Sequence, residues 1–169
     1  MQQYSDGGRP HARLVIIGDG PRRQELENLV RQYGLETCVE FAGFVENPYA
    51  LLARSDVYVA ASSNEGISNA LLEAMYLGNA VIATHAGGTP ELIDHGRNGL
   101  LVPSDAASGI AEAIGSLYTD RDLSIRLAAA GRETVRQQFS LQRMRNEIEL
   151  FLHRTIGKNY VDGSSGKTH

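Results

Sequence analysis

Two short apolar runs, Val57-Tyr58-Val59-Ala60 and Ala80-Val81-Ile82-Ala83, flank a segment with the pattern of a helix. The helix is predicted from about Asn69 to Leu77, because the glycine that follows, Gly78, can end a helix. A short, continuous apolar run is typical of a strand buried on both faces of a sheet. The stretch from 57 to 83 therefore predicts a strand, a helix and a second strand parallel to the first.

The same alternation extends to both sides of this stretch. Further apolar runs predict strands at 14–17, 39–42 and 100–102, and a helix is expected between Pro21 and Gly34. From 104 onward the pattern predicts helices only, one of them ending before Gly131 and a last one carrying Met144, Ile148, Phe151 and Leu152. Short strands separated by helices predict an α/β fold with a doubly wound, Rossmann-like parallel sheet. In such sheets ligands bind at the carboxyl ends of the strands.

Length and composition limit the number of domains that the chain can form and the kinds of partner that it can bind. A chain of 169 residues is long enough for one domain with its own core. We expect a flexible lead-in at 1–11, one domain at 12–156 and a disordered tail at 157–169. The net charge of -4 leaves no basic excess for a nucleic-acid partner. The absence of a long apolar stretch and of a signal-peptide pattern predicts a cytoplasmic location, with peripheral membrane contact left open.

The loop after the 57–60 strand reads Glu65-Gly66-Ile67-Ser68-Asn69-Ala70-Leu71-Leu72-Glu73. Gly66 leaves backbone amides open, and Ser68 or Asn69 can cap the helix that begins here. The start of a helix suits a phosphate, and Glu73, one turn inside, could accept hydrogen bonds from two ribose hydroxyls. Glu65 could accept them from hydroxyls beyond the phosphates. Both carboxylates also suit a solvated helix start, and the residues alone leave the two interpretations open.

This segment resembles the E-x7-E motif of the group 1 glycosyltransferases, which are retaining, nucleotide-sugar-dependent enzymes with the GT-B architecture. The resemblance covers about 12 to 140 and implies that the chain is the C-terminal, donor-binding half of such an enzyme. It rests on several further motifs in the family's order: Ile17-Gly18-Asp19-Gly20-Pro21, Phe41-Ala42-Gly43-Phe44-Val45, Glu73-Ala74-Met75-Tyr76-Leu77-Gly78, Gly87-Gly88-Thr89-Pro90-Glu91-Leu92-Ile93 and Gly99-Leu100-Leu101-Val102-Pro103.

The resemblance also implies roles for individual residues. Glu65 would act at the catalytic centre by contacting the transferred sugar, and Glu73 would hold the ribose hydroxyls. Phe44 and Val45 would lie at the base, beside the Gly18–Pro21 loop at the border of the cleft. The diphosphate and the sugar would be surrounded by Gly66, Ile67, Ser68, Asn69 and Leu71.

The reaction that the resemblance implies needs no metal ion and no other cofactor. The donor would be a nucleotide sugar, with UDP-sugar expected because uridine diphosphate is the commonest donor nucleotide in the family. The acceptor, which could be a glycan, a lipid or a small molecule, is not indicated by any residue of the sequence.

Two departures from the family pattern are visible. The family carries a G-R-x(n)-K-G segment whose Arg and Lys clamp the diphosphate, and no such segment occurs here, since Arg9 is poorly placed to replace it. The N-terminal domain, which binds the acceptor, is also missing. We therefore expect the chain alone to bind the donor weakly and to transfer little or no sugar.

Other functions compete with this one. A dinucleotide-binding dehydrogenase is disfavoured because Gly18-Asp19-Gly20-Pro21-Arg22-Arg23 lacks the third glycine of G-x-G-x-x-G. A non-catalytic nucleotide-sugar-binding module that needs a separate acceptor-binding chain stays open, because its donor site would look the same.

Asp120-Arg121-Asp122 has the D-x-D form of metal-dependent glycosyltransferases, but a helix N-cap at Asp120 is the favoured interpretation. His85 is interpreted as a turn residue, and no histidine has metal-ligand spacing.

Overall fold

The computed structural model describes residues 5–6, 9–10, 12–62, 66–104 and 107–139. The chain separates into two compact units, Met1–Ala50 and Leu51–His169. This boundary lies inside the range 12–156, for which the sequence analysis expects one domain. The predicted last helix, with Met144 and Ile148, and the predicted tail at 157–169 lie outside the described residues.

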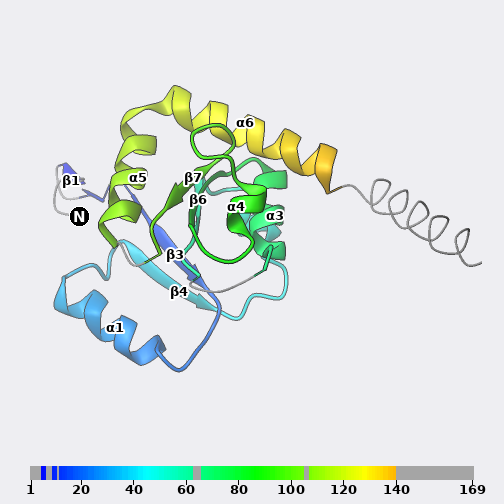
Figure 1. The fold of residues 1–169 in the computed structure, drawn as a ribbon. Coiled ribbons are helices and arrows are strands. Elements are labelled where there is room, and N and C mark those ends of the chain that lie inside the picture. The colour runs from blue at the N-terminus through cyan, green and yellow to red at the C-terminus, as the bar shows by residue number, and fades with distance from the viewer. Residues whose placement is uncertain (1–4, 7–8, 11, 63–65, 105–106, 140–169) are drawn as a thin grey trace, which may run out of the picture. The chain divides into compact units, whose positions relative to one another are not determined.

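The first unit contains four short strands and one helix (Figure 1). Strands β1 (Ser5–Asp6) and β2 (Arg9–Pro10) pair antiparallel, a pairing for which the sequence shows no signal. Strands β3 (Leu14–Ile17) and β4 (Val39–Gly43) pair in parallel. Helix α1 (Arg23–Gln32) joins them and begins two residues after Pro21, which lies in a turn.

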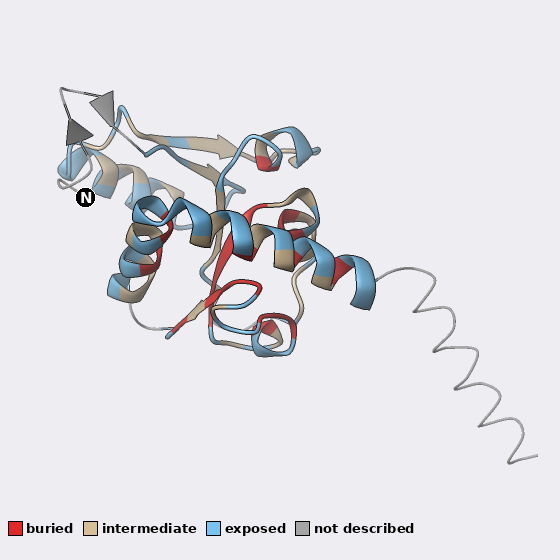
Figure 2. Cartoon of the chain, turned by 90° about the horizontal axis from the view of Figure 1, so that it is seen from above, coloured by how far each residue is buried: buried red, intermediate tan, exposed pale blue. Residues whose placement is uncertain are grey.

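The first unit has little core of its own. Helix α1 buries none of its residues, and Leu26 and Leu29 on its apolar positions remain 36% and 38% exposed. All buried hydrophobic side chains of the described residues lie from Leu52 onward (Figure 2). Burial of apolar surface is the main stabilising contribution to folding, so the second unit holds the stable core.

The second unit is a three-stranded parallel sheet in the order β5-β6-β7, where β5 is Val57–Ala60, β6 is Ala80–Thr84 and β7 is Leu100–Val102. It also contains helices α2 (Tyr49–Leu52, which begins just before the unit boundary), α3 (Asn69–Leu77), α4 (Thr89–Leu92), α5 (Ala107–Thr119) and α6 (Arg121–Gln138). The short helix α4 was not expected from the sequence.

The central strand β6 is buried on both faces. Val81 and Ala83 pack on one side in a cluster with Leu71 and Met75 of α3, while Ala80 and Ile82 pack on the other with residues of α5 and α6. This arrangement confirms the α/β fold with parallel strands between layers of helices, because a strand that is apolar at every position must be covered twice.

The five predicted parallel strands are all present, but their hydrogen bonds divide them between two sheets, β3-β4 and β5-β6-β7. The expected single sheet is therefore not continuous within the described residues.

Helix α6 continues through Gly131, where the sequence analysis expects a helix to end. A Cβ atom at Gly131 would lie 3.0 Å from the carbonyl oxygen of Asn98 and 3.4 Å from the Cε of Met75. This glycine is needed for the close approach of α6 to α3 and to the turn at Asn98. The prediction was wrong because the residue serves helix packing rather than helix termination.

Asp120 caps helix α6. It is the N-cap residue, and its Oδ1 accepts a hydrogen bond of 2.8 Å from the backbone N–H of Leu123. The capping interpretation of Asp120-Arg121-Asp122 is thereby confirmed. Among the described residues, no group of three or more His, Cys, Asp or Glu side chains is arranged to hold a metal ion.

Loss of the Asp120 cap should change the free energy of unfolding by a measurable amount. Asp120→Ala is expected to lower the free energy of unfolding by about 1 kcal/mol, because the N–H of Leu123 loses its acceptor. Asp120→Asn, which keeps an acceptor oxygen, should remain close to the unsubstituted protein. Urea unfolding of the three proteins checks this, and equal losses for both variants would contradict the capping role.

Candidate functional site

The described residues at the entry to α3 include no side-chain cap from its N-cap residue. Ser68 is the N-cap residue with an extended backbone, but its side chain makes no capping hydrogen bond. The sequence predicts a cap from Ser68 or Asn69; Ser68 holds the N-cap position without the capping hydrogen bond, and Asn69 is the first residue of the helix. Because the first N–H groups of a helix lack intrahelical partners, they can bind an anion here.

Glu73 lies one turn inside α3 and is half-buried. It follows the exposed Asn69 by four residues, so the two side chains lie on the same face of the helix. Leu71, Ala74 and Met75 are the buried residues of α3 and define the opposite face. The helix thus turns the side chains of Asn69 and Glu73 away from its core face.

Leu71 is fully buried, with 0% of its surface exposed. Its side chain packs in the core with Met75 and Val81. The predicted contact between this residue and the donor can therefore involve only its backbone N–H. The prediction took Leu71 from the family motif, whereas the helical period places its side chain on the core face.

Gly66 and Ile67 form the last bend before the N-cap. Gly66 is exposed, and the half-buried side chain of Ile67 packs against the same core cluster as Leu71. Ile67 thus anchors the loop by its side chain. Glu65, the predicted catalytic residue, lies outside the described residues.

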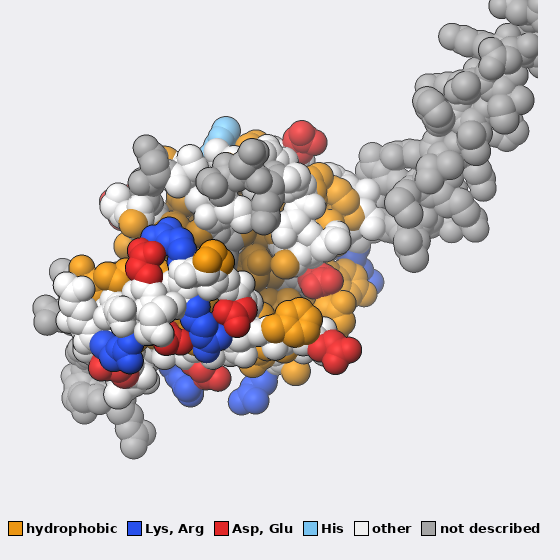
Figure 3. All heavy atoms as spheres, turned by 90° about the horizontal axis from the view of Figure 1, so that it is seen from below, with side chains coloured by type: hydrophobic (Ala, Val, Ile, Leu, Met, Phe, Trp, Pro, Cys, Tyr) orange, Lys and Arg blue, Asp and Glu red, His pale blue; other side chains and the backbone are white. Residues whose placement is uncertain are grey.

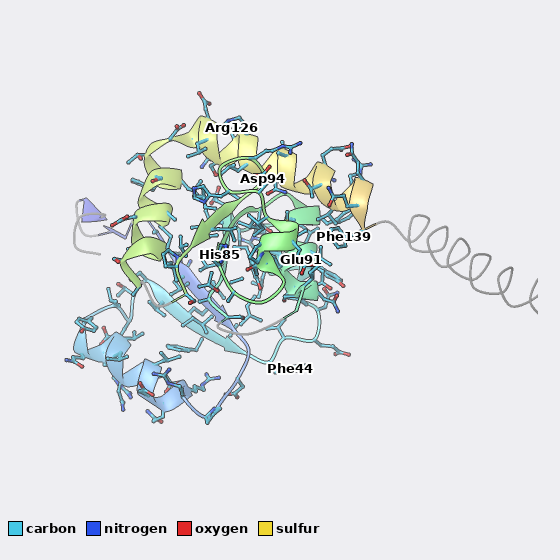
Figure 4. The ribbon with its side chains drawn as sticks, viewed as in Figure 1. Phe44, His85, Glu91, Asp94, Arg126 and Phe139 are labelled. Carbon is cyan, nitrogen blue, oxygen red and sulfur yellow. The ribbon has the colours of Figure 1, made fainter. Side chains whose placement is uncertain are left out.

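Two buried threonines, Thr84 and Thr89, hold the segment that follows β6. Figure 4 labels His85 and Glu91 of this segment. The hydroxyl of Thr84 donates to the carbonyl oxygen of Ser62, in the loop after β5. Thr89 Oγ1 lies 2.6 Å from the carbonyl oxygen of Thr84 and 2.7 Å from that of Ala86, and accepts from the N–H of Ala86 at 3.2 Å. Sequence reasoning missed both threonines, although a Thr at the start of a helix, as at Thr89, is a recognisable signal for such local bonds.

His85 is exposed, and its backbone N–H donates to the carbonyl oxygen of Val102 at 2.7 Å. The residue therefore continues the pairing of β6 with β7. The sequence predicts a turn residue at His85, and the structure places it in the bend that directly follows β6. Its side chain makes none of the hydrogen bonds found among the described residues.

Phe44 and Val45 belong to the first unit and follow β4. Gly43, at the end of that strand, has a φ of 66°, which turns the chain there. Phe44 is 83% exposed, while Val45 is half-buried. An exposed aromatic ring at the carboxyl end of a strand is available for stacking on a flat group such as a base. The predicted site residues are thus distributed between the two units, Phe44 and Val45 in the first and Gly66 to Glu73 in the second.

Arg23 is a cation at the carboxyl end of β4 that sequence reasoning did not single out. Its Nε lies 2.9 Å from Oε1 of Glu27, and its Nη1 lies 3.7 Å from Oδ2 of Asp19. The guanidinium also lies 5.8 Å from the centre of the Phe41 ring. Through these contacts Arg23 holds the start of α1 against β4.

Other charges of α1 are paired as well. Arg22 holds the pKa of Glu25 below its ordinary value, first through their hydrogen bonds and then through its charge.

Figure 3 shows acidic and basic side chains interspersed over one face of the molecule, as the composition suggests. In the part of the chain that the structure describes, no helix is long and apolar enough to cross a membrane.

Comparison with known proteins identifies relatives of the chain. The family model described as Glycosyl transferases group 1 matches residues 2–120. The lipopolysaccharide core biosynthesis glycosyltransferase LpsE of Rhizobium meliloti is 37% identical over 131 residues, which are 78% of this chain and 38% of that protein. The chain therefore spans well under half the length of this relative.

Solved structures give the same result for the fold. The structure of HepE from Anabaena in complex with UDP is 27% identical, with a TM-score of 0.81 over 86% of this chain and 42% of that one. The C-terminal domain of the group 1 glycosyl transferase LpcC from Francisella tularensis is 34% identical, with a TM-score of 0.70 over 76% of this chain and 70% of that one. The fold of this chain is thus that of the C-terminal domain of a group 1 glycosyl transferase.

Proposed function

Because this chain belongs to the group 1 family of glycosyl transferases, we propose that it binds the nucleoside-diphosphate part of a sugar donor, with uridine as the nucleoside. The observation that carries the proposal is the start of α3, where Ser68 leaves the first-turn amides without a side-chain cap. Such amides, at the positive end of a helix dipole, favour a diphosphate. The likeness to a structure that contains UDP supports the choice of nucleotide.

Each end of the donor has its own proposed contacts. The backbone amides from Gly66 to Asn69 bind the diphosphate, and Glu73 accepts hydrogen bonds from the two ribose hydroxyls. Half-burial of Glu73 supports this role, because a partly desolvated carboxylate forms stronger hydrogen bonds than one in water. Phe44 and the backbone of Val45 contact the base. Glu65 contacts hydroxyls of the transferred sugar.

The proposed reaction is a glycosyl transfer with retention at the anomeric carbon. The bond from this carbon to the diphosphate oxygen breaks while a bond to an acceptor hydroxyl oxygen forms on the same face, and the acceptor proton passes to the leaving diphosphate. Preorganised amides at α3 stabilise the charge that develops on the diphosphate. We propose that no metal ion is needed and that a separate domain binds the acceptor.

Titration of the whole chain with UDP, GDP and ADP tests this function. We expect UDP to bind at least about tenfold more tightly than the other two, a difference of about 1.4 kcal/mol. Chemical shifts of the Ile67 and Asn69 amides, followed by NMR up to millimolar nucleotide, measure binding and locate it. Tighter binding of GDP would make the nucleoside assignment wrong, and the absence of binding by all three would refute the donor site.

A further inference from the structure

Gly88 lies in contact with the loop that carries the proposed diphosphate amides. A Cβ atom at this position would be 2.8 Å from the backbone nitrogen of Ile67, 3.0 Å from the carbonyl carbon of Gly66 and 3.1 Å from Cγ1 of Ile67. Real Cβ atoms essentially never approach a backbone atom to less than 3.0 Å. Gly88 has ordinary negative backbone angles, φ -82° and ψ -2°, so the glycine is required by this close approach and not by its conformation.

The segment that contains Gly88 has little freedom to move away. Thr89, the next residue, is buried, and its hydroxyl bonds tie the segment back to the end of β6. The N–H of Glu91 also donates to the carbonyl oxygen of Gly88 at 3.1 Å. On the other side, the side chain of Ile67 is packed against the core. A side chain at position 88 would therefore displace the peptide that joins Gly66 and Ile67, because closely packed interiors transmit such strain.

We propose that Gly88 is a positioning residue, whose missing side chain sets the place of the Gly66–Ile67 peptide and of the amides that bind the donor diphosphate. This inference rests on the proposed function. It extends the site to the loop after β6, to a residue that is not one of the proposed donor contacts. Thr89 contributes to the same task by holding Gly88 against Ile67.

The test compares two glycine variants of the full chain. Gly88→Ala is expected to weaken UDP binding about tenfold, as for the loss of one charge-assisted hydrogen bond. Its affinity for uridine, which has no phosphate, should not change. The matched control is Gly99→Ala, because a Cβ there would lie 2.7 Å from Cγ2 of Val81 and 3.0 Å from Cγ2 of Ile93, and its three nearest atoms belong to these two residues and not to the diphosphate loop. It should lose stability and keep its UDP affinity.

A second pair of variants covers the case in which Gly88→Ala does not fold. Thr89→Val has nearly the same shape but lacks the hydroxyl that bonds the carbonyl oxygen of Thr84, and should also weaken UDP binding. Thr89→Ser keeps the hydroxyl and should bind UDP as the unsubstituted chain does. Equal affinities of Thr89→Val and Thr89→Ser would then overturn the inference.

The outcomes separate the two proposals. If the unsubstituted chain binds UDP, and Gly88→Ala binds it as well as Gly99→Ala does, the positioning role is wrong and the donor site stands. The positioning role is also wrong if Gly88→Ala loses uridine and UDP affinity equally, because the effect would not concern the diphosphate. If the unsubstituted chain does not bind UDP at all, the donor site and the positioning role both fail.

Discussion

Glu73→Ala is expected to weaken UDP binding by 10- to 100-fold, by about 1.4 to 2.8 kcal/mol, because hydrogen bonds to a charged group contribute about 1.5–3 kcal/mol. The carboxylate is proposed to accept from both ribose hydroxyls, and its half-buried position on α3 limits replacement by water. Isothermal titration calorimetry of the two proteins with UDP measures the change. Glu73→Gln, which retains one acceptor oxygen, should lie between them.

Two comparisons show whether the loss concerns the ribose. The unsubstituted chain should bind 2′-deoxy-UDP more weakly than UDP, and Glu73→Ala should not distinguish the two nucleotides. Glu112→Ala removes an exposed carboxylate from α5 and should leave UDP binding unchanged. An unaltered UDP affinity in Glu73→Ala would remove the ribose assignment, whereas a loss that is the same for both nucleotides would point to a general electrostatic effect.

Leu71→Ala is expected to lower the free energy of unfolding by about 2–5 kcal/mol. The side chain is fully buried beside Met75 and Val81, so its removal loses apolar burial and leaves a cavity that the packed strand cannot fill. A domain of ordinary stability unfolds with a free energy of about 5–15 kcal/mol, so this change is a large fraction of the total. Urea unfolding followed by circular dichroism measures it.

The matched control is Leu29→Ala on α1, where the side chain is 38% exposed. Its loss should be below about 1 kcal/mol, since half-exposed residues outside the core make small contributions. Leu71→Met conserves volume and should cost less than about 1.5 kcal/mol. Equal losses at Leu71 and Leu29 would mean that Leu71 does not serve the core, and its side chain could then be considered for the donor site.

Most elements were predictable because each depends on residues close together in the chain. Helix α3 begins and ends at the predicted residues, Asn69 and Leu77, since Gly78 adopts the left-handed conformation with a φ of 91° that ends a helix. The apolar runs became strands at the predicted positions, with β4 and β6 each one residue longer. Asp120 capped its helix as expected, because capping needs only the three residues that follow.

The sequence predicted which residues belong to the candidate site better than it predicted which way their side chains face. The loop from Gly66 to Asn69 and the half-buried Glu73 lie at the start of α3, as the motif indicates. The role of Leu71 was assigned from the motif, and its burial restricts that role to the backbone. A motif shows which residues occur together, but the face of the helix that meets the core depends on what packs against it.

The family, the order of the five parallel strands and the place of Glu73 on α3 follow from the sequence alone, because they depend on short patterns and their spacing. The packing of distant segments was needed to show that Gly131 lies within a helix, against Asn98 and Met75, and that Gly88 borders Ile67. It also decided the division of the strands between two sheets. Strand pairing and close approach are set by packing between elements, which a local pattern does not specify.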